Sequence, residues 1–313
     1  MLRSNLLNYF IGGLCFVSCM LFFTTFSYAQ SNGRVRVAPA VQEVTMKTDE
    51  KNKDIIITYT NSTNSELTLS LSTLDFKQSD DLGRIGFLSE SSGYSYSLSS
   101  FLSLQSDELR LAPQESKDIV VRIENRDDVS PGGHYAAVLA KVQSDRKQGT
   151  TSISPTLSSL LLVSKQGGER YNLSLKSVGW PDSPVVFSIP QRSEYLFQNE
   201  GNVPLVPQGR VDVVDMFQRS IAKGVVNESS ARIFPESRRY ITVQYYHQKW
   251  AFPVSVLTMV AKGNDALHKT GYSHRDIVLY IHPAVIILLL VVMGVMVSMY
   301  RRRRGQRQEG KHE

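Results

Sequence analysis

The sequence predicts an all-β protein with two β-sandwich domains in tandem and one transmembrane helix at the C-terminal end. Three observations predict it. Short apolar stretches with a period of two residues recur between polar turns. None of these stretches shows a helical period. A long uncharged segment near the C-terminus is followed at once by four arginines, which is the pattern of a membrane span with its stop-transfer signal.

The strands of the first domain, residues 30–166, show the alternation clearly. Leu67, Leu69 and Leu71 alternate with polar residues, which is typical of a strand with one buried face. A β-branched run at 55–60 ends in an Asn-rich turn. A further turn comes from residues 130–133, which read Ser-Pro-Gly-Gly. These signals predict an antiparallel sandwich with further strands at 119–123, 135–140 and 160–163.

The second domain, residues 167–262, follows a short linker at 165–169 and repeats the pattern of short strands and turns. Strands are expected at 171–175, 185–189, 195–197, 210–214, 231–234, 240–245 and 252–260. The two halves also share two landmarks. Each has an Asn-rich turn after an early strand, at 59–63 and 197–202, and an apolar-x-Pro step before a later one, at 111–113 and 233–235. Both domains are therefore expected to be immunoglobulin-like β-sandwiches.

The N-terminal 29 residues have the layout of a secretory signal peptide. Arg3 precedes an apolar stretch from 6 to 26, and residues 27–29, Ser-Tyr-Ala, form a cleavage site with cleavage expected after Ala29. An uncleaved anchor helix is the alternative. A lipoprotein signal is a weaker one, because the sequence before Cys19 only loosely resembles a lipobox.

The C-terminal segment 277–300 contains 24 residues without a charged side chain. As a helix it would be about 36 Å long, enough to cross a hydrocarbon core of roughly 30 Å. The stop-transfer residues Arg301, Arg302, Arg303 and Arg304 follow directly. They predict a cytoplasmic basic tail at 301–313, a polar stalk at 263–276, and a single-pass cell-membrane protein with its N-terminus outside.

Charge and cysteine content exclude several classes of function. Of the net charge of +6, the tail carries +4 and Arg3 carries +1. The body of the chain is thus nearly neutral, which gives no support for nucleic-acid binding. The two cysteines, Cys15 and Cys19, both lie in the predicted signal peptide. The mature chain then has no disulfide, thiolate metal site or cysteine nucleophile.

No catalytic motif appears in the sequence. The six histidines do not have metal-ligand spacing, and the carboxylate pairs Asp80-Asp81 and Asp127-Asp128 are typical of solvated turns. We therefore predict a protein that is not an enzyme and holds no cofactor or metal. A glycosidase remains open, because its two carboxylates need not be close in sequence. Three N-glycosylation sequons, at Asn61, Asn172 and Asn227, are expected to be unmodified.

Four segments, taken in order, carry a family resemblance. They are 37–40 (Val-Ala-Pro-Ala), the turn at 59–64, 111–116, and 130–138, which contains Pro-Gly-Gly-His-Tyr. In this order they resemble the N-terminal, peptidoglycan-binding-type domain of the WxL-interacting surface proteins of Gram-positive bacteria. The first domain is also distantly similar to the N-terminal domain of periplasmic pilus chaperones. The resemblance implies two immunoglobulin-like domains, one C-terminal span and a basic tail.

Two functional hypotheses follow. The first is a non-enzymatic cell-surface binding or scaffold protein that presents its two sandwiches to cell-wall glycan or to a surface protein. The alternative is a membrane-anchored extracytoplasmic chaperone or assembly factor that acts by β-strand addition.

The segment 83–104 is unusual because it places aromatic residues among serines and glycines, a composition that suits recognition and also suits a long hairpin with buried rings. Its aromatic residues and the Pro-Gly-Gly stretch supply the candidate ligand contacts Tyr94, Tyr96, Phe101, His134 and Tyr135. If the tyrosines prove to be buried, the recognition surface is expected first on the sheet edge beside residues 34–44.

Overall fold

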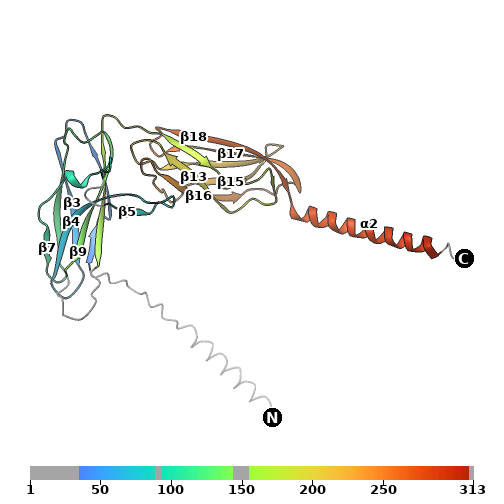
Figure 1. The fold of residues 1–313 in the computed structure, drawn as a ribbon, viewed down its shortest axis with the longest axis horizontal. Helices are drawn as coiled ribbons and strands as arrows, with labels where there is room; N and C mark the ends of the chain where they lie inside the picture. Colours follow the sequence, from blue (N-terminus) through green and yellow to red (C-terminus); the bar gives the residue numbers. More distant parts are fainter. Residues whose placement is uncertain (1–34, 89–92, 144–154, 310–313) are drawn as a thin grey trace, which may run out of the picture.

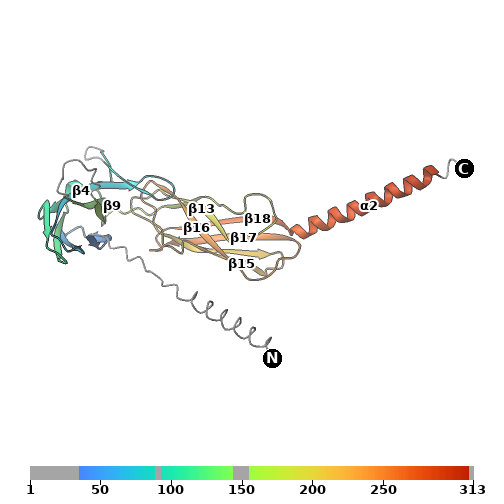
Figure 2. The same ribbon diagram turned by 90° about the horizontal axis from the view of Figure 1, so that it is seen from below.

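The computed structural model describes residues 35–88, 93–143 and 155–309. The predicted signal peptide lies outside these residues. The chain is built almost entirely of strands, with one long helix, α2, at the C-terminal end. The first domain lies across one end of the second, and α2 leaves from the opposite end (Figures 1 and 2). The predicted fold class, two β-sandwich domains and one C-terminal apolar helix, is confirmed.

The first domain is a sandwich of two sheets. One has the order β1-β3-β8-β6 and the other has the order β2-β10-β9-β4-β5, with β7 also paired to β4. A core of aliphatic residues from both sheets lies between them, including the fully buried Ile57, Leu69 and Leu161. The strands of the first sheet are β1 (Val35–Ala38), β3 (Asn52–Asn61), β6 (Leu102–Leu104) and β8 (Ser116–Glu124). Those of the second are β2 (Val41–Met46), β4 (Leu67–Gln78), β5 (Ile85–Phe87), β7 (Glu108–Leu111), β9 (Gly132–Val142) and β10 (Thr156–Lys165), and a 3-10 turn, η1, covers Ser99–Phe101.

The sequence predicts an antiparallel sandwich, but the structure also contains parallel strand pairs. The chain changes sheets between β1 and β2, so that β1 runs antiparallel to β3 while β2 runs parallel to β10. In the second domain β12 and β18 are also parallel. Periodicity shows which side chains of a strand face the core, but it does not show which strand lies beside it, and the parallel pairs were therefore not predictable from the pattern.

The second domain is one eight-stranded sheet that folds around a single core. The core contains Tyr195, Phe197, Val211, Val243, Leu257 and Met259, all buried. The strand order is β11-β13-β16-β15-β14-β17-β18-β12. In chain order these strands are β11 (Leu173–Ser177), β12 (Val185–Val186), β13 (Arg192–Asn199), β14 (Pro207–Asp215), β15 (Ser220–Val226), β16 (Arg238–His247), β17 (Val254–Asp265) and β18 (Gly271–Ile281).

The expected stalk at 263–276 does not exist as such. These residues form the end of β17 and the first half of β18, and β18 pairs with β17 along its whole length. The first half of its outer face is polar, with exposed Ser273 and Arg275, and the buried Tyr272, Val278 and Tyr280 are its contribution to the core. The sequence therefore reads as a polar linker although it forms a strand. The prediction was also wrong at 231–234, where only a bridge between Leu205 and Ile233 forms, and it missed β15.

Helix α2 covers Pro283–Glu309, so residues 277–281 of the predicted span belong to β18. Proline fits the first turn of a helix, because the amide hydrogens there have no intrahelical partner. The part that is long and apolar enough to cross a membrane is Pro283–Arg301, 19 residues, none of them buried.

In each domain the Asn-rich turn and the apolar-x-Pro step are in direct contact. Asn61 and Asn199 are fully buried. The Asn61 side-chain amide donates to the carbonyls of Leu111 and Ala112, at 3.2 and 2.9 Å. The Asn199 amide donates to Val203 and Ile233, at 2.7 and 2.9 Å. In both domains the buried asparagine thus joins its own turn to the backbone of the apolar-x-Pro step.

The Pro steps have the same backbone conformation. Gln114 follows Pro113 with a φ of 60°, and Glu236 follows Pro235 with a φ of 57°. A proline followed by a residue with positive φ forms a type II turn. Each turn closes with a backbone hydrogen bond of 3.2 Å, from Glu115 to Ala112 and from Ser237 to Phe234. The second of these turns lies where the two domains meet.

We predict that Asn199→Ala lowers the free energy of unfolding by roughly 3 kcal/mol, because it leaves two buried carbonyls without a donor. Urea unfolding of the full chain in nanodiscs, followed by tryptophan fluorescence, measures the change. The matched control is Asn172→Ala, an exposed asparagine in the same domain, which should change stability by no more than about 0.5 kcal/mol. Equal effects of the two substitutions would contradict the structural role of Asn199.

Candidate functional site

The two domains are joined by an aromatic cluster. Phe76 in β4 and Tyr135 in β9 are fully buried, and Phe234 of the second domain packs between them. The ring of Phe234 meets those of Phe76 and Tyr135 edge-on, with centroids 5.7 and 4.9 Å apart. Such edge-to-face pairs add about 0.5–1.5 kcal/mol each beyond the burial of area. Phe234 of the second domain thus packs its ring among buried aromatic rings of the first domain.

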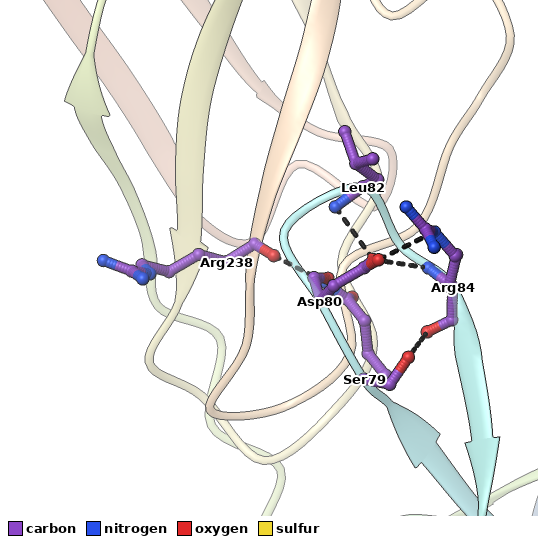
Figure 3. Close-up of polar contacts among 6 residues, drawn as sticks. Ser79, Asp80, Leu82, Arg84 and Arg238 are labelled. Atoms are coloured by element: carbon purple, nitrogen blue, oxygen red, sulfur yellow. Dashed lines mark hydrogen bonds and ion pairs between the residues drawn. The ribbon is translucent and has the colours of Figure 1, made fainter.

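The β4–β5 hairpin extends this joint along the second domain (Figure 2). The Asp80 carboxylate accepts hydrogen bonds from the backbone N–H groups of Leu82 and Arg84, both 3.0 Å long (Figure 3). It also forms an ion pair with the Arg84 side chain. The backbone hydrogen bond from Arg84 is the main cause that lowers the pKa of Asp80. These contacts shape the turn that reaches β16.

At the end of β4, Gln78 bonds the backbone of the second domain with both ends of its amide. Its nitrogen donates to the Arg238 carbonyl, and its oxygen accepts from Phe234 N. The Asp81 carbonyl accepts from the Tyr240 amide at 2.7 Å, and the Arg238 guanidinium lies 3.2 Å from the Asp81 carboxylate. The hairpin therefore adds a polar border to the aromatic joint.

The Pro-Gly-Gly stretch forms the other side of the joint. Gly133 N donates to the Asn202 carbonyl at 2.7 Å, and the Asn202 amide donates to the Pro131 carbonyl at 3.1 Å. Gly132 has a φ of +121°, and a Cβ atom on it would lie 2.8 Å from Asn202. Glycine is needed here because it leaves room for the second domain to approach the backbone.

The structure places the predicted contact residues in this joint or in the core. Tyr96, His134 and Tyr135 are 8%, 3% and 0% exposed, and Tyr94 and Phe101 are half-buried. Of the two alternatives for the aromatic segment, burial is the one observed for Tyr96. Tyr96 and Tyr135 are not free for recognition, because they pack with Phe76 and Phe234 in the aromatic cluster.

Their polar atoms serve the joint as well. The Tyr96 hydroxyl donates to the Glu236 carboxylate of the second domain at 2.9 Å, and burial raises the pKa of Tyr96 to about 12. The two ring nitrogens of His134 lie 2.9 and 2.8 Å from the carbonyls of Ser97 and Ser130. The stretch that carries the family resemblance thus has a structural task in this protein.

A cleft of about 440 Å³ opens beside the joint, between β2 and the second domain. Residues 43–45 of β2 and residues 162–164 of the neighbouring β10 line one side of it. The facing side is mostly apolar and includes Val203, Pro204, Val206 and Leu267. A single ion pair, Glu43 with Arg232, crosses between the domains here. Both side chains are partly exposed, so this pair contributes no more than about 1 kcal/mol.

Strand β2 is the edge strand of its sheet in the described part of the chain. The Ala40 and Met46 carbonyls accept from Leu160 and Gln166, at 2.9 and 3.0 Å. Since alternate residues bond inward in a parallel pair, Val41, Glu43 and Thr45 point their backbone groups away from β10. The Thr45 carbonyl accepts from the Lys53 ammonium at 2.8 Å, while Val41 is 45% exposed.

This edge is the second location named from the sequence, and the cleft beside it was not predicted. The signal for the strand was present, because Val44 and Met46 alternate with polar residues and are buried. The facing wall comes from residues more than 120 positions away, which no local pattern connects to β2. Within residues 35–88, 93–143 and 155–309, no group of three or more His, Cys, Asp or Glu side chains gathers that would hold a metal ion.

No protein-family model and no curated protein match the chain, so the resemblance to WxL-interacting proteins has no support from these comparisons. Among solved structures, the chain is similar to a chaperone–tip adhesin complex of CFA/I fimbriae, with 11% identity, 77% of this chain and 98% of that chain covered, and a TM-score of 0.45. The match to the class 5 fimbriae chaperone CfaA has 11% identity, covers 77% of this chain and 98% of that chain, and has a TM-score of 0.44. The match to the E. coli chaperone DraB has 10% identity, covers 77% of this chain and 96% of that chain, and has a TM-score of 0.37. At these identities and TM-scores the likeness carries no information about what this chain binds.

We predict that Phe234→Ala uncouples the two domains. Truncating a buried phenylalanine costs about 3–5 kcal/mol, and here the loss falls on the joint. In differential scanning calorimetry the single transition expected for the wild-type chain should separate into two. Tyr246→Ala, which truncates an exposed ring of the same domain that lies outside the joint, is the control and should leave the profile unchanged. A single transition in both variants would show that Phe234 does not couple the domains.

Proposed function

We propose that this protein is a membrane-anchored, non-enzymatic assembly or binding protein that holds an extended segment of a protein partner along β2, in the cleft between its domains. One observation carries the proposal: β2 is an edge strand with outward backbone groups at Val41 and Glu43, and Glu43 also lines a cleft whose far wall is mostly apolar. Edge strands with free backbone groups are templates for the addition of another strand.

The dimensions suit a short segment. β2 has six residues and is therefore about 20 Å long, which matches a partner strand of five or six residues. In β-strand addition the main-chain hydrogen bonds supply affinity and pockets for alternate side chains supply specificity. Here Val203, Pro204, Val206 and Leu267 would receive the apolar side chains of the segment.

The glycan-binding hypothesis loses support. It drew on the resemblance to a peptidoglycan-binding-type domain, which no comparison supports, and on candidate contacts of which Tyr96 and Tyr135 are buried in the domain joint. Rings that bind a sugar must present a free face, and these are covered by Phe234 or by each other. A protein partner therefore fits the described surface better than cell-wall glycan does.

We further propose the orientation with the domains outside the cytoplasm and the arginine-rich tail inside. The positive-inside rule supports it, because Arg301–Arg304 follow the apolar part of α2 directly. In this orientation the cleft faces proteins that have already crossed the membrane.

The proposal predicts that Glu43→Pro weakens segment binding by roughly two- to tenfold relative to Glu43→Ala. Both variants lose the ion pair with Arg232, but only proline removes the outward backbone N–H, and one hydrogen bond is worth about 0.5–1.5 kcal/mol. Proline is tolerated on an edge strand where the N–H faces outward. The measurement is fluorescence anisotropy with peptides selected from a displayed random library on the full chain in nanodiscs.

Two results would refute strand addition at β2. One is equal affinity of the proline and alanine variants for the selected peptides. The other is a selection that yields no peptides while the same protein sediments with purified peptidoglycan, which would favour the glycan-binding hypothesis.

The orientation has its own test. Protease added to intact cells or spheroplasts should degrade residues 35–281 and leave a fragment that contains α2 and the tail. An antibody to an epitope placed after Glu313 detects that fragment. Full protection of the two domains would reverse the orientation.

A further inference from the structure

The end of the second domain from which α2 leaves carries a set of exposed aromatic residues. Phe187, Phe217, Trp250 and Phe252, here called the aromatic rim, are 48%, 64%, 87% and 45% exposed. A tryptophan with nearly nine-tenths of its surface free is costly in water, since apolar area favours burial by about 25 cal/mol per Å². Exposed apolar patches of this kind mark an interaction surface.

The rim is assembled from three separate loops. Phe217 lies in the β14–β15 turn and Phe252 in the β16–β17 loop, with ring centroids 5.7 Å apart. The Arg219 guanidinium lies 4.1 Å above the Phe252 ring. Phe187 follows β12, which pairs with the last residues of β18. All three loops therefore open at the same end of the domain as the start of α2 (Figure 1).

No flexible linker separates this end from the helix. Ile281, the last residue of β18, is still paired with Val254. His282 N then donates to the Pro253 carbonyl at 2.7 Å, and Pro283 begins α2. The residue directly before the span is thus tied by a hydrogen bond to the loop that carries Trp250 and Phe252.

The length of the span fixes the height of the rim. The apolar part of α2 has 19 residues and is about 28 Å long at 1.5 Å per residue. The hydrocarbon core of a bilayer is about 30 Å thick. Because the helix has no spare turn, Pro283 must lie at the edge of the hydrocarbon, and the residues beside it must lie in the headgroup layer.

We infer that the aromatic rim is a membrane-binding surface and that Trp250 and its neighbours insert into the headgroup region of the leaflet that α2 enters. Tryptophan and other amphipathic rings concentrate in this layer because it is apolar on one side and wet on the other. Lys249, beside Trp250, is exposed and is placed to meet lipid phosphates. A hollow of about 570 Å³ lined by Ile189, Ile221, Trp250, Tyr280 and Pro283 offers room for part of a lipid.

The inference requires that α2 spans a bilayer, and it does not depend on what the cleft binds. It fixes the position of the second domain relative to the membrane. β17 runs from Val254 beside the rim to Asp265 at the cleft, 12 residues, or about 40 Å. The rim would therefore hold the cleft at most about 40 Å above the membrane.

The sequence makes Trp250 a direct reporter, because the chain has two tryptophans and the other, Trp180, is buried in the core of the second domain. The full chain and its Trp250→Phe variant are reconstituted in phosphatidylcholine vesicles with or without bromine on the acyl chains. Bromine quenches only nearby tryptophan. The Trp250 emission, taken as the difference between the two proteins, should fall by at least about twofold in brominated vesicles, as expected for an interfacial tryptophan. The Trp180 emission of the variant should change little.

A second reporter guards against a variant that fails to fold. Phe217 is exposed, so a dye attached at Phe217→Cys, in a chain with Cys15 and Cys19 replaced by serine, should report an apolar environment in vesicles. In both experiments flotation on a density gradient confirms that the protein is inserted. The inference is overturned if the inserted protein shows the same Trp250 emission in both lipids and that emission is quenched by aqueous iodide. It is equally overturned if the rim is shielded by a second copy, seen as cross-linking between Trp250→Cys chains.

Discussion

The insertion of Phe234 into the first domain is the contact on which the rest of the arrangement depends. Phe234 sits at a type II turn of the second domain, and its ring is 6% exposed between Phe76 and Tyr135. Burying a phenylalanine contributes about 1.5–3 kcal/mol. The ion pair at the mouth of the cleft, Glu43 with Arg232, is partly exposed and contributes less. The domains are therefore fixed at the joint and only lightly bridged at the cleft, so a partner segment can replace that ion pair at little cost.

The joint can form because the backbone approaches closely on both of its sides. Gly132 and Gly133 admit Asn202, whose carbonyl accepts from Gly133 N at 2.7 Å. Gly83, with a φ of +81°, admits the Arg239 side chain, which lies where a Cβ atom would be. Both contacts involve glycine in turns whose length and residues are ordinary for a β protein. Their importance is visible only when the opposite domain is present.

Local patterns were enough to predict the strands and the landmarks, and long-range contacts decided the rest. Asn61 and Asn199 were singled out as turn residues, and each bonds the Pro step of its own domain, because both landmarks belong to one compact unit. The first half of β18 was taken for part of a stalk because residues 271–276 are mostly polar. Tyr96 and Tyr135 were named as candidate contacts, and the composition of the segment 83–104 left open whether its rings are exposed or buried. Tyr135 is covered by Phe234, about 100 positions later in the chain, and no local pattern contains that information.

The stiffness of β17 connects the two proposed surfaces. This strand is hydrogen-bonded to β14 on one side and β18 on the other over most of its length, so neither end can move without the other. A rim fixed in the headgroup layer would keep the cleft at one height and in one orientation. A partner segment would then meet a site whose rotational and translational freedom is already restricted, which lowers the entropic cost of association. Strand addition is demanding in alignment, because a shift of one residue turns every side chain to the other face. An edge strand held in place by both its domain joint and its membrane contact meets that demand better than one on a flexible stalk.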